Sequence, residues 1–155
     1  MPVVVDGPLC ACGGRGCLEA LVGARAILAR YRSLACAPRP AGVSGQRIEA
    51  EPLSVRRLAQ RAGDGEAAAV ATFCETGRIL GLALAGLTQL LDPDLFVVGG
   101  GISRSAPLFL PAARAALGEA AMLAPSMQPR VEPAILGPDA GWIGAARAAA
   151  EGPAG

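Results

Sequence analysis

Three cysteines near the N-terminus have the residue type and the spacing of a metal site. Cys10, Cys12 and Cys17 lie within eight residues, and glycines at positions 13, 14 and 16 let the chain between them fold back. Thiols this close together in a reducing compartment are poor candidates for disulfides and good ligands for zinc. A structural zinc has four protein ligands, and this loop offers three. The alternative is three incidental thiols; we interpret Cys36 as a stray thiol and Cys74 as a small core residue.

A second candidate site is the run Gly99-Gly100-Gly101, which follows the apolar segment Leu95–Val98. Glycines after a strand and before a helix offer backbone N–H groups that a phosphate or an adenosine can approach closely. The run lacks the G-x-G-x-x-G spacing of dinucleotide sites, which argues against a hydride-transfer cofactor. The alternative is a simple tight turn.

Two residue types are missing from the chain, and their absence excludes several classes of site. There is no His, and all 14 basic residues are Arg, so there is no Lys. The chain by itself therefore holds no Ser-His-Asp or Cys-His nucleophilic site and no metal site that includes His. It also holds no P-loop of the Walker type and no Schiff-base lysine.

The elements that must position these residues alternate between strand-like and helix-like segments, which predicts an α/β fold. The first of these segments, Pro2–Val5, is predicted to be the end of a strand, and Ser54 is expected to cap a helix over 55–62. The remaining expected segments are a loop over 6–17, a helix over 19–32, a loop over 33–52, a buried strand over 95–98, a helix over 106–122, a strand over 131–136 and a helix over 142–150.

The longest expected element is a helix over 64–91, with Asp64 as its cap and Asp92-Pro93 as its stop. Apolar or small residues recur within it at a spacing of three to four residues. Glycines at 77, 81 and 86 each weaken such a helix by up to about 1 kcal/mol relative to Ala. They are therefore expected to mark close packing of the backbone.

A chain of 155 residues is one domain or part of one. It has no run of 18 bulky apolar residues, so we expect no membrane span and a cytoplasmic protein. Residues 25–61 carry eight Arg against two acidic residues. This basic block is either a nucleic-acid footprint or a solvated helix face. We favour the helix face, with outward-pointing arginines at positions 25, 30, 32, 56, 57 and 61.

Three segments resemble the ROK family (repressors, open reading frames and kinases) in the family's own order. Gly7 to Glu19 is similar to its zinc motif, Leu91 to Ser103 to its glycine loop, and Asp139 to Ala146 to its C-terminal segment. The resemblance implies the C-terminal half of an actin-like ATPase (ribonuclease H-like) sugar kinase fold, with the N-terminal domain missing. It divides residues 1–155 into a zinc loop over 1–19, the long helix over 64–91 and the glycine loop over 95–103.

The resemblance also assigns roles to residues. It implies a structural zinc held by Cys10, Cys12 and Cys17, with the family's His ligand falling just before Met1. Glu19 matches a glutamate that hydrogen-bonds sugar hydroxyls, the alternative being a first-turn acid that complements the helix dipole. The glycines at 99, 100 and 101 are assigned to the nucleotide. No catalytic base is expected in this chain, since the family carries it in the N-terminal half.

These observations predict part of an ATP-dependent hexose kinase of the glucokinase kind, which binds a sugar and Mg-ATP and forms a homo-oligomer, either a dimer or a tetramer. We expect the chain alone to be inactive and Met1 to be internal to a longer reading frame. The alternative is the sugar-binding domain of a ROK repressor, in which case DNA is a partner. A small zinc-binding interaction module would explain the cysteines but leave the glycine loop unexplained.

Overall fold

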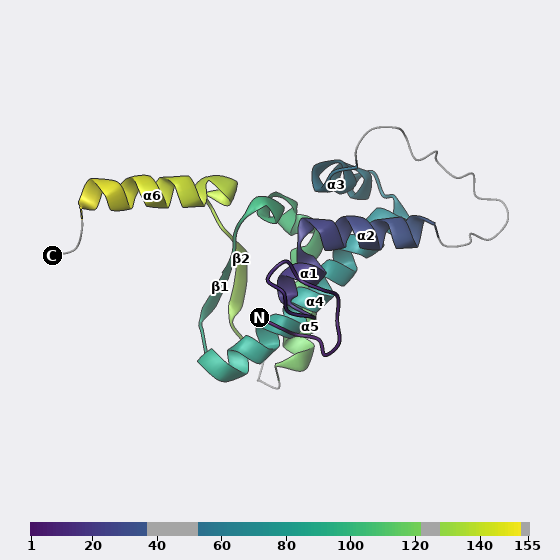
Figure 1. The fold of residues 1–155 in the computed structure, drawn as a ribbon, viewed down its shortest axis with the longest axis horizontal. Coiled ribbons are helices and arrows are strands. Elements are labelled where there is room, and N and C mark those ends of the chain that lie inside the picture. The colour runs from purple at the N-terminus through teal and green to yellow at the C-terminus, as the bar shows by residue number, and fades with distance from the viewer. Residues whose placement is uncertain (37–52, 122–127, 153–155) are drawn as a thin grey trace.

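Two long helices, α4 (Ala67–Leu91) and α5 (Ala106–Ala120), form the centre of the computed structural model, which describes residues 1–36, 53–121 and 128–152 (Figure 1). Three shorter helices pack against α4. They are α1 (Leu18–Val22), α2 (Ala24–Ala35) and α3 (Val55–Gly63). The remaining elements are strands β1 (Leu95–Val98) and β2 (Arg130–Pro133), the 3-10 helices η1 (Gly101–Ser105) and η3 (Gly137–Asp139), and helix α6 (Ala140–Glu151). The predicted α/β fold agrees with this order of elements.

The predicted long helix is confirmed as α4, but it begins differently from the prediction. Its N-cap residue is Glu66, whereas Asp64 follows the last turn of α3 and its N–H donates to the carbonyl of Gln60. Asp92 ends the helix as expected, in a left-handed conformation with φ 46°. The residue before a proline avoids the right-handed helical region, so Asp92 cannot continue the helix into Pro93.

The seam between α4 and α5 depends on two glycines of α4. A Cβ atom on Gly77 would lie 2.1 Å from the carbonyl oxygen of Phe109, and one on Gly81 would lie 2.2 Å from that of Ala113. The expected close packing is therefore confirmed at these two positions. At Gly86 it is wrong, since a Cβ there would meet nothing within 4 Å.

Helix α4 is long and apolar enough to cross a membrane by length and composition alone. Half of its most apolar window is buried inside the protein, where α4 packs against four other helices. A central core helix of a soluble protein has the same properties, so this helix is weak evidence for a membrane span.

The strands form a parallel pair, in which Leu95 is opposite Arg130 and Val98 is opposite Pro133. The expectation of a buried β1 is wrong, because Leu95 and Val97 are exposed and the other two residues are only half-buried. Strand β2 ends three residues earlier than predicted. The N-terminal segment forms no strand and makes a single antiparallel bridge, between Pro2 and Cys17. Figure 1 shows α6 extending away from the other helices, with η3 as its main contact.

The predicted helix over 19–32 is divided at Gly23 into α1 and α2. The cap of α3 is confirmed, since the Ser54 hydroxyl accepts a hydrogen bond from the Arg57 N–H at 3.2 Å. The predicted loop over 33–52 begins later than expected because α2 continues to Ala35, and its residues 37–52 lie outside the described part of the chain. Helix α5 ends at Ala120, before the predicted end at 122, a position that lies outside the described part of the chain.

Several arginines of the basic block face inward, which corrects the expectation of a fully solvated face. Arg30 is half-buried and its guanidinium donates to the hydroxyl of Thr76. Arg61 donates to the Tyr31 hydroxyl at 2.7 Å, and that hydroxyl donates to a Glu66 carboxylate oxygen at 2.6 Å. This polar cluster joins α2, α3 and the start of α4. Arg25, Arg32 and Arg56 are exposed as expected; Arg57 is half-buried.

Candidate functional site

The cysteine loop, residues 1–17, is folded by backbone hydrogen bonds between its own ends. The carbonyl oxygen of Gly16 accepts from the N–H groups of Val3 and Val4, at 2.8 and 3.2 Å, and the N–H of Gly16 donates to Pro8. Gly16 has φ +65°, and a Cβ on it would lie 1.7 Å from the Val4 carbonyl oxygen. Only glycine fits this position, because a side chain would be excluded both by the backbone angle and by the contact.

The loop brings the three predicted thiols together. The Sγ atoms of Cys10, Cys12 and Cys17 all lie within 4.8 Å of one another, and the last two are 3.6 Å apart. Cys17 is buried, Cys10 is half-buried and Cys12 is exposed. The interpretation of Cys74 as a core residue is wrong, since it lies exposed on α4. Cys36 is also exposed and lies outside the cluster.

The thiols of this cluster differ in acidity. A hydrogen bond from the Gly14 N–H, followed by bonds from the neighbouring thiols, lowers the pKa of Cys12. The hydrogen bond to Cys12, together with burial, raises the pKa of Cys17 to about 11. One negative charge is thus favoured on the exposed sulfur. A divalent cation would favour the thiolate form of all three, and zinc is the cation that suits sulfur ligands at this spacing.

Glu19, the predicted sugar ligand, lies in the first turn of α1, two residues after Cys17. A Cβ atom on Gly23 would lie 2.4 Å from a carboxylate oxygen of Glu19 and 2.5 Å from its carbonyl oxygen. The absence of a side chain at Gly23 therefore makes room for the carboxylate, and the chain turns there into α2. The side chain of Glu19 is exposed to solvent.

The glycine loop, Gly99–Gly101, connects β1 to η1. Gly100 has φ +82°, which favours glycine, and its carbonyl oxygen accepts from both the N–H and the hydroxyl of Ser103, at 3.1 and 2.7 Å. A Cβ atom on Gly100 or Gly101 would meet nothing within 4 Å. The loop is thus held in place by Ser103 while its outer surface is open to a ligand.

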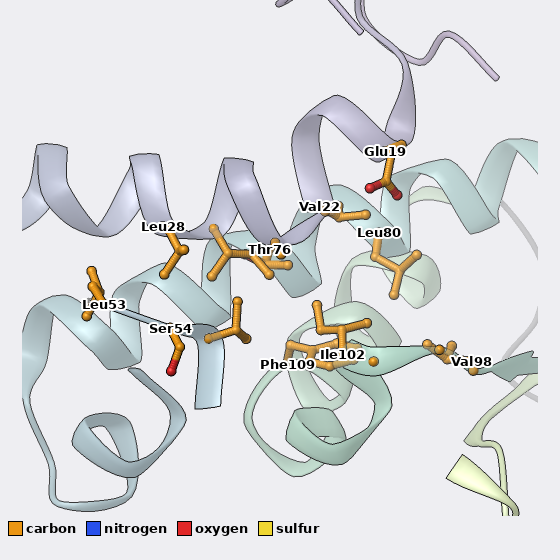
Figure 2. A pocket seen from close by; sticks show the side chains of 17 residues that line it. Glu19, Val22, Leu28, Leu53, Ser54, Thr76, Leu80, Val98, Ile102 and Phe109 are labelled. Atoms are coloured by element: carbon orange, nitrogen blue, oxygen red, sulfur yellow. The ribbon is translucent and has the colours of Figure 1, made fainter. Parts of the chain in front are cut away.

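The two predicted ligand-binding segments line one cavity. This Glu19 cavity has a volume of about 790 Å³, and its walls include Glu19, Gly23 and all three residues of the glycine loop. In Figure 2, Glu19 extends from α1 at the right side of the cavity, the same side as Val98, the last residue before the glycine loop. Leu53 and Ser54 lie at the left side. Most of the remaining lining is apolar, with Val22, Leu28, Leu80 and Ile102 among the residues labelled.

A second cavity, the Trp142 cavity, adjoins the first, because Val55 and Gly101 line both. It has a volume of about 880 Å³ and is lined by Arg56, Arg104 and Trp142, among others. Sequence reasoning did not find these three residues as site residues. The sequence placed Arg56 on a solvated helix face. Arg104 could have been noticed because it lies three residues after the glycine loop.

Comparison with known proteins gives consistent results. A family model described as ROK family matches residues 1–151. The crystal structure of a ROK family glucokinase from Streptomyces griseus, in complex with glucose and AMPPNP, superposes with a TM-score of 0.80 at 34% identity, over 98% of this chain and 50% of that chain. This similarity confirms the expected kinship with the ROK sugar kinase fold.

Two further proteins represent the two branches that the sequence left open. A glucokinase of Streptomyces coelicolor is 33% identical over 117 residues, which are 70% of this chain and 35% of that protein. The structure of a ROK family transcriptional regulator, a homologue of the Escherichia coli MLC protein, matches at 26% identity with a TM-score of 0.66, over 85% of this chain and 33% of the other. This chain therefore spans half or less of the proteins it matches.

Proposed function

The chain belongs to the ROK family, and on that premise we propose that it forms the sugar- and nucleotide-binding part of an ATP-dependent hexose kinase. The reaction is transfer of the γ-phosphoryl group of ATP to a sugar hydroxyl. Catalysis of this kind consists mainly of positioning the two substrates and stabilising charge on the phosphates. The catalytic base and the remaining phosphate contacts are expected in the part of the relatives that this chain does not match.

The observation that carries the proposal is the shared wall of the Glu19 cavity. A carboxylate at one place in that wall can accept hydrogen bonds from sugar hydroxyls. The glycine loop at another place leaves its backbone open to a phosphate group. A kinase needs an acceptor sugar and a phosphate donor within one space, and this cavity is lined by residues suited to both.

The Trp142 cavity supports a place for the nucleoside of ATP. The Trp142 side chain is 82% exposed and offers a flat face on which a base can stack. Arg56 and Arg104 supply positive charge to the same cavity. Because Gly101 lines both cavities, a nucleotide bound here would direct its phosphates past the glycine loop towards the Glu19 cavity.

The cysteine cluster fits a structural zinc held by Cys10, Cys12 and Cys17. Zinc bound there would stabilise the thiolates and contribute no chemistry to the sugar. Cys17 is the N-cap residue of α1, so its position sets where that helix begins. A fixed Cys17 thus helps to place Glu19, two residues later. The fourth zinc ligand would be a residue other than these cysteines, or a water molecule.

The kinase proposal is tested with the protein expressed from the complete reading frame that encodes this chain. A coupled assay of ADP release with glucose, mannose and N-acetylated hexosamines should show sugar-dependent turnover. Glu19→Gln should raise the KM for the sugar by about tenfold to a hundredfold, since a charged hydrogen bond contributes about 1.5–3 kcal/mol. Glu119→Gln, an exposed position on α5, is the matched control.

The 155-residue chain alone should stay at background in the same assay, because the catalytic base lies elsewhere. Turnover by the chain alone would show that the catalytic base does not lie outside these 155 residues. Equal KM values for Glu19→Gln and Glu119→Gln would remove Glu19 from the sugar site.

The second candidate function is the sugar-binding domain of a transcriptional regulator, which the similarity to the ROK regulator supports. Such a protein releases or binds DNA in response to a sugar and has no use for ATP. Gly100→Ala separates the two functions, since an alanine at φ +82° distorts the glycine loop. A kinase should lose ATP affinity with this variant, whereas a regulator should keep its response to the sugar. A homo-oligomeric state and a cytoplasmic location remain predictions.

A further inference from the structure

Helix α1 carries Glu19 and packs against α4 and α2, but it is short and buries none of its side chains fully. It is five residues long, has no buried residue and ends where the chain turns at Gly23. Its last carbonyl groups lack partners within the helix, as at every helix C-terminus. A polar contact at this end would therefore add to the packing of α1 and help to fix its angle to the cavity.

That contact comes from Arg30, on the second turn of α2. One guanidinium nitrogen, Nη2, donates to the carbonyl oxygen of Leu21 at 2.9 Å, in the last turn of α1. The other, Nη1, donates to the hydroxyl of Thr76 at 2.8 Å. The planar guanidinium thus bridges the end of α1 and the central helix α4 with two hydrogen bonds.

The partner on α4 is set to accept this bond. Thr76 is 1% exposed, lines the Glu19 cavity and donates its own hydroxyl hydrogen to the carbonyl oxygen of Thr72 at 2.8 Å. Its oxygen is left as an acceptor facing α2. Among the described residues Arg30 forms no ion pair within 4 Å, so its half-buried charge is stabilised by these two oxygens and by the more distant carboxylate of Glu75.

We infer that Arg30 is a positioning residue, which anchors the end of α1 to α4 so that the carboxylate of Glu19 faces the cavity. This inference rests on the proposed function, because the purpose of the anchoring is sugar binding. The missing side chain at Gly23 leaves room for the carboxylate, since a Cβ there would come within 2.4 Å of it. With Arg30 holding Leu21 and the turn at Gly23 open, the carboxylate is confined to the cavity wall.

The activity test compares Arg30→Met with Arg32→Met, an exposed arginine on the same helix. In the protein from the complete reading frame, Arg30→Met should raise the KM for the sugar about tenfold and leave the KM for ATP unchanged. Arg30→Lys keeps the charge but has a single donor nitrogen, so its KM for the sugar should fall between those of Arg30→Met and Arg32→Met. Combined with Glu19→Gln, the Arg30→Met change should add little, because both act on the same contact.

A structural test separates this inference from the proposed function. In the 155-residue chain, the N–H groups of Ala20 and Gly23 donate to the carbonyls of Cys17 and Glu19 within and at the end of α1. Hydrogen exchange at these two amides should be about tenfold faster in Arg30→Met than in Arg32→Met. If Arg30→Met does not fold, Thr76→Val removes the α4 end of the anchor with nearly unchanged volume and should also speed exchange at these two amides.

The outcomes can be told apart. No sugar-dependent turnover in the unmodified protein would overturn the proposed function, and the exchange data would still decide whether Arg30 anchors α1. Equal exchange rates in Arg30→Met, Thr76→Val and Arg32→Met would overturn the anchoring role. A rise in both KM values with equal exchange would likewise contradict it.

Discussion

The α4–α5 seam and the cysteine loop both depend on glycine, but the seam needs only the missing side chain, whereas the loop also needs backbone angles that favour glycine. In the seam, Gly77 and Gly81 have ordinary helical angles, and the space beside them is filled by backbone carbonyls of α5. In the cysteine loop, Gly13 has φ +86° and open space around it. The seam uses the missing side chain to bring two helices together, and the loop uses the freedom of the backbone to bring three sulfurs together.

The two regions therefore obtain their stability from different sources. Phe73 and Phe109 are fully buried beside the seam, so it is stabilised by the burial of apolar surface. The loop exposes Val5 and Leu9 and has few buried side chains, so its shape depends on backbone hydrogen bonds, to which the proposed zinc would add. A change in the seam should affect the whole fold, whereas a change in the loop should stay local.

The largest effect is expected for Gly81→Ala. Its methyl group would lie 2.2 Å from the Ala113 carbonyl oxygen, so α5 must move, and overpacking of this kind costs about 1–3 kcal/mol in the free energy of unfolding. Urea unfolding followed by circular dichroism measures the loss. Gly86→Ala on the same helix meets nothing and should stabilise the protein by up to about 1 kcal/mol. Equal effects at the two positions would refute the account of the seam.

A smaller, local effect is expected for Cys12→Ser. The variant should lose most of the zinc that the unmodified chain carries, about one ion per chain, as measured by elemental analysis. The free energy of unfolding of α4 and α5 should change by less than about 0.5 kcal/mol, because Cys12 is exposed and far from the core. Cys74→Ser is the control, since that exposed thiol lies outside the cluster. Unchanged zinc content in Cys12→Ser would exclude the metal site.

The smallest effect is a difference in the rate of alkylation between Cys12 and Cys17, with no change in the stability of the fold. In the metal-free chain near pH 7.5, iodoacetamide should modify Cys12 faster than Cys17. The thiolate is the reactive form, and the lowered pKa of Cys12 gives more of it, whereas a pKa of about 11 keeps Cys17 protonated. Mass spectrometry of peptides identifies the modified residue. Added zinc should slow both reactions, and faster modification of Cys17 would reverse the assignment of acidity.

Local sequence signals predicted those elements whose stability is itself local. The spacing of apolar residues indicated α4, and Ser54 and Asp92 marked the start of one helix and the end of another. The spacing of Cys10, Cys12 and Cys17 predicted a cluster that the structure brings together. Each of these signals lies within a few turns of the chain, where residue type restricts the backbone directly.

The errors concern properties that depend on distant contacts. Cys74 and the strand at Leu95 are apolar in sequence, but burial requires packing neighbours, and the described residues leave Cys74 and Leu95 exposed. Arginine is usually a surface residue, so the sequence offered no reason to expect Arg30 to face inward. The packing of α1 against α4 brings two acceptors to it, the Leu21 carbonyl and the Thr76 hydroxyl. The meeting of Glu19 with the glycine loop, 80 residues later, could be expected from family resemblance alone.

The place of Trp142 has a spectroscopic consequence. It is the one tryptophan of the sequence, and its side chain is 82% exposed on α6, at the edge of a cavity that residues of α3 and α5 also line. Its emission in the folded protein should already resemble that of indole in water, so unfolding of the core will change the fluorescence very little. A ligand or a protein segment that covers α6 should shift the emission to shorter wavelength. The intrinsic fluorescence of this protein thus reports on what occupies the edge of the Trp142 cavity, without any introduced label.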